Sequence, residues 1–186
     1  LTDAADALNT LGISGAVTFE IMSDTYNEQV ELLSIAGASP GNTITFTSES
    51  GDSTDVTISF SAGETSNYVI WLRGTDFITF DKLTIAPTNA SYARGIVLSG
   101  NASYVTIQNC IFNGAGTSSN NSIIYADDAL INDITVTNNI FNNGYYAICL
   151  YAEDLSYVEN IQVNNNTMAV QAKGGIYLSY QNASKA

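Results

Sequence analysis

Four segments of the chain share one pattern of apolar and polar residues at a nearly constant spacing. The segments DFITFDKLTI, SYVTIQNCIF, NDITVTNNIF and ENIQVNNNTM align on Ile78, Val105, Ile134 and Ile161, in steps of 27, 29 and 27 residues. Each reads apolar, polar, apolar over three residues, a period of two that predicts a short strand rather than a helix. Self-similarity at such a period indicates a repeat architecture built from strands.

A second set of apolar segments recurs in the same order. YVIWL, GIVLS, SIIYA, AICLY and GIYLS occupy residues 68–72, 95–99, 122–126, 147–151 and 175–179. Three short strands in each coil of about 25–29 residues, always in this order, indicate a chain that climbs, with each strand parallel to its copy about 4.8 Å away. The predicted fold is therefore all-β, a right-handed parallel β-helix. We expect a single domain, with a helical cap over residues 1–12, about six coils over residues 13–186 and an uncapped C-terminal end.

Two polar columns fit this fold. Lys82, Asn109, Asn138 and Asn165 follow the first strand of each repeat, where a sharp corner requires left-handed backbone angles that asparagine tolerates. Stacked asparagines in this column are also expected to hydrogen-bond along the coils. A threonine column is expected on the outer surface, closed by a glutamine: Thr18, Thr45, Thr57, Thr79, Thr106, Thr135 and Gln162.

The segment LTDAADALNTLG predicts a short amphipathic helix over the first coil. Thr2 is the candidate N-cap and Gly12 the stop. Ala5, Leu8 and Leu11 are the expected buried positions. Such a helix would shield the unpaired strand edges that an open coil exposes.

Composition excludes several classes of function. The chain has 18 acidic and 5 basic residues, no histidine and a net charge of −13. Nucleic-acid binding requires clustered Lys and Arg, so it is not expected. No apolar run is long enough to insert in a membrane. Cys110 and Cys149 are expected to be free thiols in the core, because two cysteines make neither a disulfide framework nor a zinc site.

A family resemblance rests on the opening residues. GAVTFEIMSDTYNEQVEL and the following IAGASPGNTITFTSESGDSTDVTISF resemble the start of large secreted or surface right-handed β-helix proteins of the Bacteroidetes, within the pectin-lyase-like superfamily. The resemblance covers nearly the whole chain and implies the fold. It implies an extracellular or cell-surface location. It does not imply one activity, since that superfamily includes lyases, esterases, hydrolases and adhesins.

The residues do not favour catalysis. The absence of histidine rules out the Gly-His-Gly motif of polygalacturonases. Arg73 and Arg94, as candidate bases, are not expected to share one face. Asp76 and Asp81 lie near Arg73 in sequence, as in a methylesterase site, but are interpreted as a solvated turn.

Two acidic motifs leave two interpretations open. YADD ends in Asp127 and Asp128, and YAED ends in Glu153 and Asp154, 26 residues further along. Stacked on neighbouring coils, these four carboxylates would form a Ca²⁺ site, since Ca²⁺ prefers hard oxygen ligands. The alternative is an exposed turn without metal. No other cofactor is expected.

Six tyrosines are concentrated in the last third of the chain. Aromatic rings with polar tips suit glycan or protein contact when exposed. We expect several of these rings to line one open groove, with Tyr151, Tyr177 and Tyr180 as ligand-binding candidates. The full set is Tyr145, Tyr146, Tyr151, Tyr157, Tyr177 and Tyr180.

The sequence thus favours a secreted or cell-surface β-helix module for adhesion, glycan binding or rigid display, noncatalytic as it stands. Its expected partners are a glycan or another surface protein. One alternative is the N-terminal part of a polysaccharide-active enzyme of the lyase or esterase type. Another is a filament-forming protein that associates end to end or continues into further coils.

Overall fold

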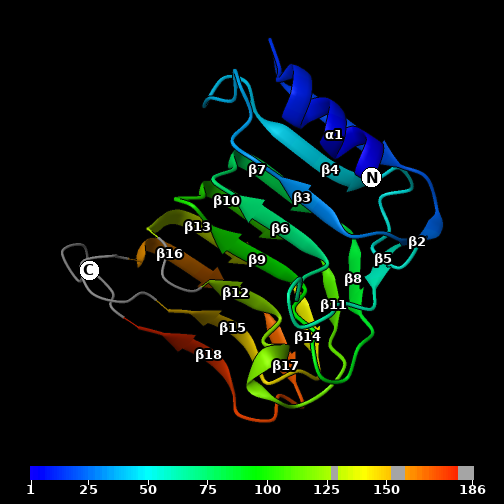
Figure 1. The fold of residues 1–186 in the computed structure, drawn as a ribbon, viewed down its shortest axis with the longest axis vertical. Helices are drawn as coiled ribbons and strands as arrows, with labels where there is room; N and C mark the ends of the chain where they lie inside the picture. Colours follow the sequence, from blue (N-terminus) through cyan, green and yellow to red (C-terminus); the bar gives the residue numbers. More distant parts are fainter. Residues whose placement is uncertain (127–129, 152–157, 180–186) are drawn as a thin grey trace.

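The computed structural model describes residues 1–126, 130–151 and 158–179 (Figure 1). Their strands form three parallel sheets of six strands, and each coil contributes one strand to each sheet. This arrangement confirms the predicted parallel β-helix of about six coils with a short N-terminal helix.

The strands alternate among the sheets in chain order. Sheet A contains β1 (Val17–Ile21), β4 (Ile44–Ser48), β7 (Asp76–Asp81), β10 (Ser103–Gln108), β13 (Ile131–Thr137) and β16 (Val158–Asn164). Sheet B contains β2 (Asp24–Asn27), β5 (Val56–Phe60), β8 (Thr84–Pro87), β11 (Ile111–Asn113), β14 (Ile140–Asn142) and β17 (Thr167–Ala169). Sheet C contains β3 (Val30–Leu32), β6 (Ile70–Arg73), β9 (Ile96–Ser99), β12 (Ile124–Ala126), β15 (Tyr146–Leu150) and β18 (Gly174–Leu178). One 3₁₀ turn, Ser119–Asn121, precedes β12.

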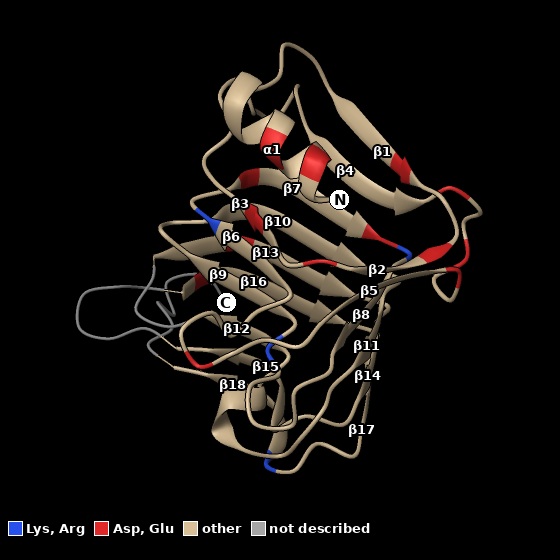
Figure 2. Ribbon diagram, turned by 45° about the vertical axis from the view of Figure 1, so that its right-hand side comes forward, with Lys and Arg blue, Asp and Glu red and all other residues tan. Residues whose placement is uncertain are grey.

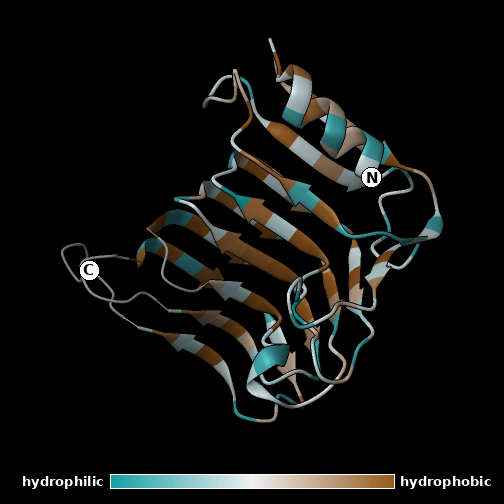
Figure 3. Ribbon diagram, in the orientation of Figure 1, coloured by the Kyte–Doolittle hydropathy of each residue, from teal (hydrophilic) through white to brown (hydrophobic). Residues whose placement is uncertain are grey.

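The register follows the sequence repeat. Ile78, Val105, Ile134 and Ile161 pair in succession across sheet A, as the alignment predicts. Side chains at such positions point inward and stack with their copies, which buries apolar surface continuously along the axis. Hydrophobic residues accordingly alternate with polar ones along the strands (Figure 3).

The predicted corner is confirmed by its backbone. Lys82, Asn109, Asn138 and Asn165 have φ of 53°, 54°, 56° and 54°. Each ends a strand of sheet A and lets the chain turn toward sheet B. A second left-handed column, which the sequence analysis missed, lies inside the sheet A strands where the register skips one residue. It contains Phe77, Tyr104, Asp133 and Asn160, with φ of 52–56°.

The expected asparagine ladder lies one residue beyond the corner column. Asn139 is 1% exposed, accepts from the Cys110 backbone N–H at 2.8 Å and donates to the Ile107 carbonyl at 2.9 Å. Asn166 repeats the pattern on the next coil, donating to the Val136 carbonyl at 2.8 Å. The prediction was wrong by one residue, because the left-handed residue turns its side chain outward while the next one points into the coil.

The threonine column is confirmed with one exception. Thr18, Thr45, Thr79, Thr106, Thr135 and Gln162 pair in register across sheet A. Thr57 lies instead in β5 of sheet B, paired with Thr25 and Thr84. The error arose because VTI in β5 has the same alternation as the sheet A strands.

Helix α1 (Thr2–Leu11) lies against β3 and covers the N-terminal end of the coils (Figure 1). Ala5 and Leu8 are buried as expected, and Gly12 ends the helix with φ of 66°. Leu11, by contrast, is 81% exposed. The described helix is too short and too polar to be a candidate for crossing a membrane.

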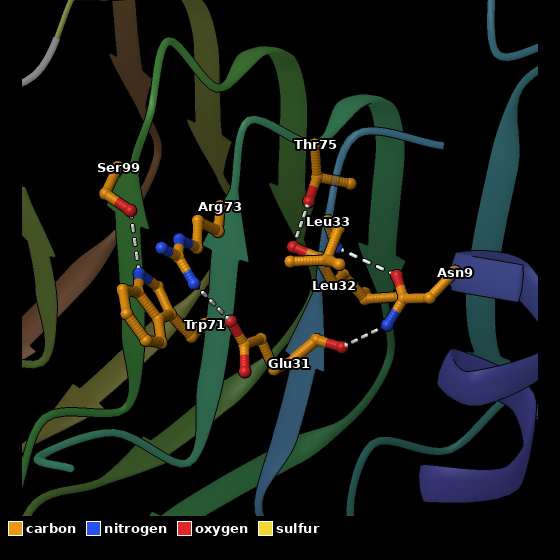
Figure 4. A network of polar contacts seen from close by, with 8 residues as sticks. All are labelled: Asn9, Glu31, Leu32, Leu33, Trp71, Arg73, Thr75 and Ser99. Atoms are coloured by element: carbon orange, nitrogen blue, oxygen red, sulfur yellow. Dashed lines mark hydrogen bonds and ion pairs between the residues drawn. The ribbon is translucent and has the colours of Figure 1, made fainter. Parts of the chain in front are cut away.

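Polar side chains attach α1 to the first coil. Asn9 donates to the Glu31 carbonyl and accepts from the Leu33 N–H, both at 2.9 Å, so its amide occupies the open edge of β3 as a paired strand would (Figure 4). Thr2 is not the N-cap. That position belongs to Leu1, and Thr2 instead donates its N–H and hydroxyl to Glu28 at 2.7 and 2.9 Å.

Candidate functional site

The outer face of sheet C carries a column of large side chains. In β12, β15 and β18 the inward positions are filled by apolar residues, so the residue between them points outward. The outward residues Tyr125, Cys149 and Tyr177 pair in succession across these strands. No Lys, Arg, Asp or Glu occurs in β9, β12, β15 or β18, which are tan throughout in Figure 2.

A cavity of about 370 Å³ opens on this face. This volume lies near the lower end of the range for small-ligand sites, about 300–1,000 Å³. We call it the tyrosine cavity. Its lining residues are Arg94, Ser119, Asn120, Ser122, Tyr125, Tyr145, Tyr146, Cys149, Tyr151 and Tyr177.

The structure brings the expected tyrosines together. Tyr145 and Tyr146 pack edge to face with ring centroids 5.0 Å apart, and Tyr146 contacts Tyr177 at 5.5 Å. Tyr151 lines the same cavity directly after β15. Tyr180, the third candidate, lies outside the described residues. A groove lined by several tyrosine rings is thus present, while ligand binding stays a prediction.

Arg94 is the only charged residue among the described residues that line the tyrosine cavity. Its guanidinium carbon lies 3.4 Å from the centroid of the Tyr125 ring, a close cation–π contact. Its Nε atom is buried without a hydrogen-bond partner. The ion pairs found in the described part of the chain do not involve Arg94. The guanidinium therefore has donors left for an anionic ligand.

Neighbouring loops hold Arg94 and the cavity rim in place. The Arg94 backbone N–H donates to the side-chain oxygen of Asn67 at 3.1 Å. The side-chain NH₂ of Asn67 donates in turn to the Asn120 carbonyl at 2.7 Å. Asn121 is fully buried and donates to the Ala90 carbonyl at 2.9 Å. These hydrogen bonds join three successive loops that connect sheet B to sheet C. The rim of the cavity is therefore fixed by hydrogen bonds between coils.

Glycine permits one of these loops to pack. Gly116 has φ of 120°, and a Cβ atom there would overlap the Ala90 carbonyl oxygen and the Asn121 amide. Any other residue would push the rim outward.

Neither cysteine belongs to a disulfide and both are buried, but they occupy different sites. Cys110 points into the coil, where burial raises the pKa of its thiol to about 12. Cys149 is 8% exposed and lines the tyrosine cavity between Tyr125 and Tyr177. The expectation of free thiols is confirmed, although only Cys110 belongs to the interior.

Arg73 and Arg94 lie on one face, contrary to the sequence analysis. Arg73 lies over the Trp71 ring at 5.2 Å, and Arg94 shares a smaller cavity with Trp71 on sheet C. The prediction was wrong because Arg73 ends β6 whereas Arg94 precedes β9. The sequence does not show how these two positions align between coils. Arg73 is already paired with Glu31 at 3.3 Å.

The trio of Arg73, Asp76 and Asp81 does not form a site. Asp76 opens β7, not a preceding loop, and accepts from the Ser103 N–H and hydroxyl at 2.9 and 2.7 Å. Asp81 accepts from the Asn109 amide at 2.7 Å. Each carboxylate therefore stabilises a contact between coils.

The proposed calcium ligands Asp127, Asp128, Glu153 and Asp154 lie outside the described residues. The strands before them pair Tyr125 with Cys149, not with Tyr151, so the 26-residue spacing of the two motifs is not the spacing of these strands. Over residues 1–126, 130–151 and 158–179 no group of three or more acidic or cysteine side chains could hold a metal ion. Calcium binding therefore remains an untested prediction.

Comparison with known proteins decides the family. A family model described as a right handed beta helix region matches residues 37–185. The chain belongs to this right-handed beta helix family. No curated protein matches this beta helix protein in sequence.

One solved structure is similar to this beta helix protein over most of its length. It is a pectin methylesterase variant in complex with a hexasaccharide, with a TM-score of 0.56 and 11% sequence identity. The match covers 87% of the present chain but only 61% of the esterase. At this identity the likeness concerns the fold alone, and it supports the pectin-lyase-like architecture that the opening residues suggested.

The sequence analysis did not assign Tyr125 or Cys149 to the site, and it considered Arg94 only as a candidate catalytic base. A signal was present for two of them, since Tyr125 and Cys149 lie between inward residues in SIIYA and AICLY, at matching outward positions. No signal marked Arg94, because its position depends on how three loops outside the repeat pack together.

Proposed function

We propose that this beta helix protein is a secreted or cell-surface module that binds an acidic glycan on the outer face of sheet C. The observation that carries the proposal is the guanidinium of Arg94, held on the Tyr125 ring in a cavity lined by five tyrosines. The chain belongs to the right-handed beta helix family, and its fold is similar to that of a pectin methylesterase.

The chemistry of the tyrosine cavity favours such a ligand. Tyrosine rings offer flat apolar faces for the C–H faces of sugars, and their hydroxyl groups hydrogen-bond sugar hydroxyls. A guanidinium pairs with a carboxylate through two parallel hydrogen bonds. In a chain of net charge −13, an arginine outside the ion pairs of the described residues is a local exception that would select an anionic group. The hexasaccharide held by the pectin methylesterase of similar fold suggests a uronate polymer as the first probe.

Enzyme activity is the second candidate. Within the described lining of the tyrosine cavity there is no carboxylate, and the chain has no histidine, so the commonest general acid–base groups are missing from that part of the site. Asp127 and Asp128 nevertheless follow β12 directly, and Tyr125 of β12 lines the cavity. These two aspartates are the specific observation that favours the lyase or esterase alternative.

The test is calorimetric titration of the whole chain with oligogalacturonate and with its fully methyl-esterified, uncharged counterpart. We expect the acidic ligand to bind better, and R94Q to weaken its binding about tenfold or more, because a buried ion pair would be lost. K82Q removes an equal charge at the corner of sheets A and B and should bind like the wild type.

Two results would overturn the proposal: no binding of either ligand, or equal binding by R94Q and the wild type. Release of methanol or of unsaturated product in the same mixtures would establish the enzyme alternative instead. Light scattering of the same samples tests the third candidate, since growth into polymers without ligand would favour end-to-end assembly.

A further inference from the structure

A second cavity of about 180 Å³ lies on the same face, toward the N-terminal coils. We call it the tryptophan cavity. It shares Arg94 with the tyrosine cavity, so the two are adjoining hollows of one surface. Its lining residues are Glu64, Thr65, Ser66, Asn67, Tyr68, Trp71, Arg94 and Val97.

The aromatic residues of the tryptophan cavity are held in place before any ligand arrives. The Trp71 indole N–H donates to the Ser99 hydroxyl at 2.8 Å (Figure 4). Arg73 lies over the Trp71 ring at 5.2 Å and is itself paired with Glu31 at 3.3 Å. Tyr68 contacts Trp71 with ring centroids 5.2 Å apart. Fixed rings lose little conformational entropy on binding, which favours their use as a platform.

The loop that closes the tryptophan cavity is also anchored. Gln29 donates to the Ser66 and Tyr68 carbonyls at 2.8 and 2.9 Å. Asn67 joins this loop both to Arg94 and to Asn120 on the rim of the tyrosine cavity. The two hollows are thus parts of one rigid frame.

Sheet geometry sets the distance between the two hollows. Trp71, Val97 and Tyr125 pair in succession as outward residues of β6, β9 and β12. Two strand spacings place Trp71 about 10 Å from Tyr125 along the coil axis. We expect two linked sugars to be too short to fill both hollows, so only a chain longer than a disaccharide can occupy both.

The charges of the two hollows differ. The described lining of the tyrosine cavity contains Arg94 and no carboxylate. The tryptophan cavity adds the negative charge of Glu64 to the positive charge of the shared Arg94. Burial and then the nearby Glu31 carboxylate raise the pKa of Tyr68, so its phenol keeps its proton to a higher pH than an ordinary tyrosine does. A negatively charged sugar beside Glu64 would be repelled, whereas an uncharged one would not.

We infer that the ligand is a linear glycan lying along the coil axis, with an acidic sugar at Arg94 in the tyrosine cavity and an uncharged sugar on Trp71 in the tryptophan cavity. This inference rests on the proposed glycan binding and adds its direction, minimum length and mixed charge. Glu64 is the residue that discriminates against charge at the second position.

The experiment compares fully acidic with partly methyl-esterified oligogalacturonates, as disaccharides and as hexasaccharides, on the whole chain. The partly esterified hexasaccharide should bind about threefold or more tightly than the fully acidic one, and E64Q should remove this preference. W71A should weaken hexasaccharide binding about tenfold and leave disaccharide binding within about twofold, as expected for loss of a central aromatic contact.

Matched variants keep the test decisive. E49Q removes an exposed carboxylate elsewhere and should retain the wild-type preference. W71F keeps an aromatic ring and should bind the hexasaccharide better than W71A. If W71A does not fold, W71F is compared with the wild type instead and should bind the hexasaccharide less tightly. If R94Q abolishes binding but E64Q and the tryptophan variants change neither charge preference nor length dependence, the inference is wrong and the proposed function stands. If no oligogalacturonate binds the wild type, the proposed function itself fails.

Discussion

The guanidinium carbon of Arg94 lies 3.4 Å from the centroid of the Tyr125 ring, on the floor of the tyrosine cavity. The ring covers one face of the cation. A loop residue and a strand residue are thus held together, because the loop N–H of Arg94 is fixed by Asn67 while Tyr125 is fixed by β12.

Removal of the Tyr125 ring should weaken ligand binding even though Arg94 is retained. Y125A frees the guanidinium and removes an aromatic face from the cavity, so it should lower affinity for oligogalacturonate about tenfold through lost pre-organisation and lost ring contact. Y125F keeps the ring and should stay within about twofold of the wild type. Calorimetric titration measures both, and equal affinities for Y125A and Y125F would contradict the assigned role of the ring.

The two thiols should differ in reactivity. Only a thiolate is nucleophilic, and the pKa of Cys110 of about 12 keeps it protonated at pH 8 and still largely protonated at pH 10. In the folded protein, iodoacetamide should therefore modify Cys149 at the cavity wall and leave Cys110 unmodified until urea unfolds the chain. Peptide mass mapping reads both sites, and C149S serves as the control. Modification of both thiols at one rate would refute this difference.

A bound glycan should protect Cys149. Saturating oligogalacturonate would cover the tyrosine cavity and slow the modification of Cys149 several-fold, because the reagent enters through the same opening. The R94Q variant, which should bind the ligand more weakly, provides the comparison at a ligand concentration that just saturates the wild type. Protection that is equal in R94Q and the wild type would indicate an effect unrelated to the cavity.

Asn139 should contribute strongly to stability. N139A leaves the buried Cys110 N–H and Ile107 carbonyl without partners, at a cost of about 1–3 kcal/mol for each group. We expect the free energy of unfolding in urea to fall by about 2–4 kcal/mol. N142A removes only a solvent-exposed bond to Asn113 and should change it by less than about 0.5 kcal/mol. A similar small loss in both variants would argue against the buried ladder.

Lys82 offers a stabilising substitution. Its φ of 53° places a lysine where the other coils use asparagine, and its ion pair with Asp81 is long at 3.9 Å. K82N should raise the free energy of unfolding by about 0.5–1 kcal/mol, because asparagine tolerates left-handed angles better. N138K is the reverse change and should lower it by a similar amount. Changes of the same sign in the free energy of unfolding of K82N and N138K would contradict this prediction.

Calcium binding at the two acidic motifs can be tested directly. If Asp127, Asp128, Glu153 and Asp154 hold Ca²⁺, adding CaCl₂ should raise the Tm, and removing it with EDTA should reverse the rise. The double variant D128N/D154N should lose the effect. A wild-type Tm that does not respond to Ca²⁺ would leave these residues as an exposed turn.

The register of sheet A could be predicted because every inward residue must meet an apolar copy on the next coil. A shift by one residue would turn Ile134 and Val136 outward, so the repeat allows one alignment. The same logic did not assign Thr57 to its sheet, because strands of sheets A and B share one alternation. It also misplaced the buried ladder by one residue, since the direction of Asn139 depends on the turn that precedes it.

The site was only partly predictable. Tyr151 and Tyr177 could be selected from the clustering of tyrosines, and both line the cavity. Arg94 could not, because it precedes its strand and acquires its neighbours through Asn67 and Asn120, which belong to other coils.

The sequence by itself determined the repeating coil, its parallel pairing and its left-handed corners, since these follow from local periodicity and from the backbone preferences of single residues. Only the tertiary structure decided which outer face is hollowed and which cation lies in the hollow. Loops of unequal length pack against one another there, and their contacts depend on distances across coils that no local pattern encodes.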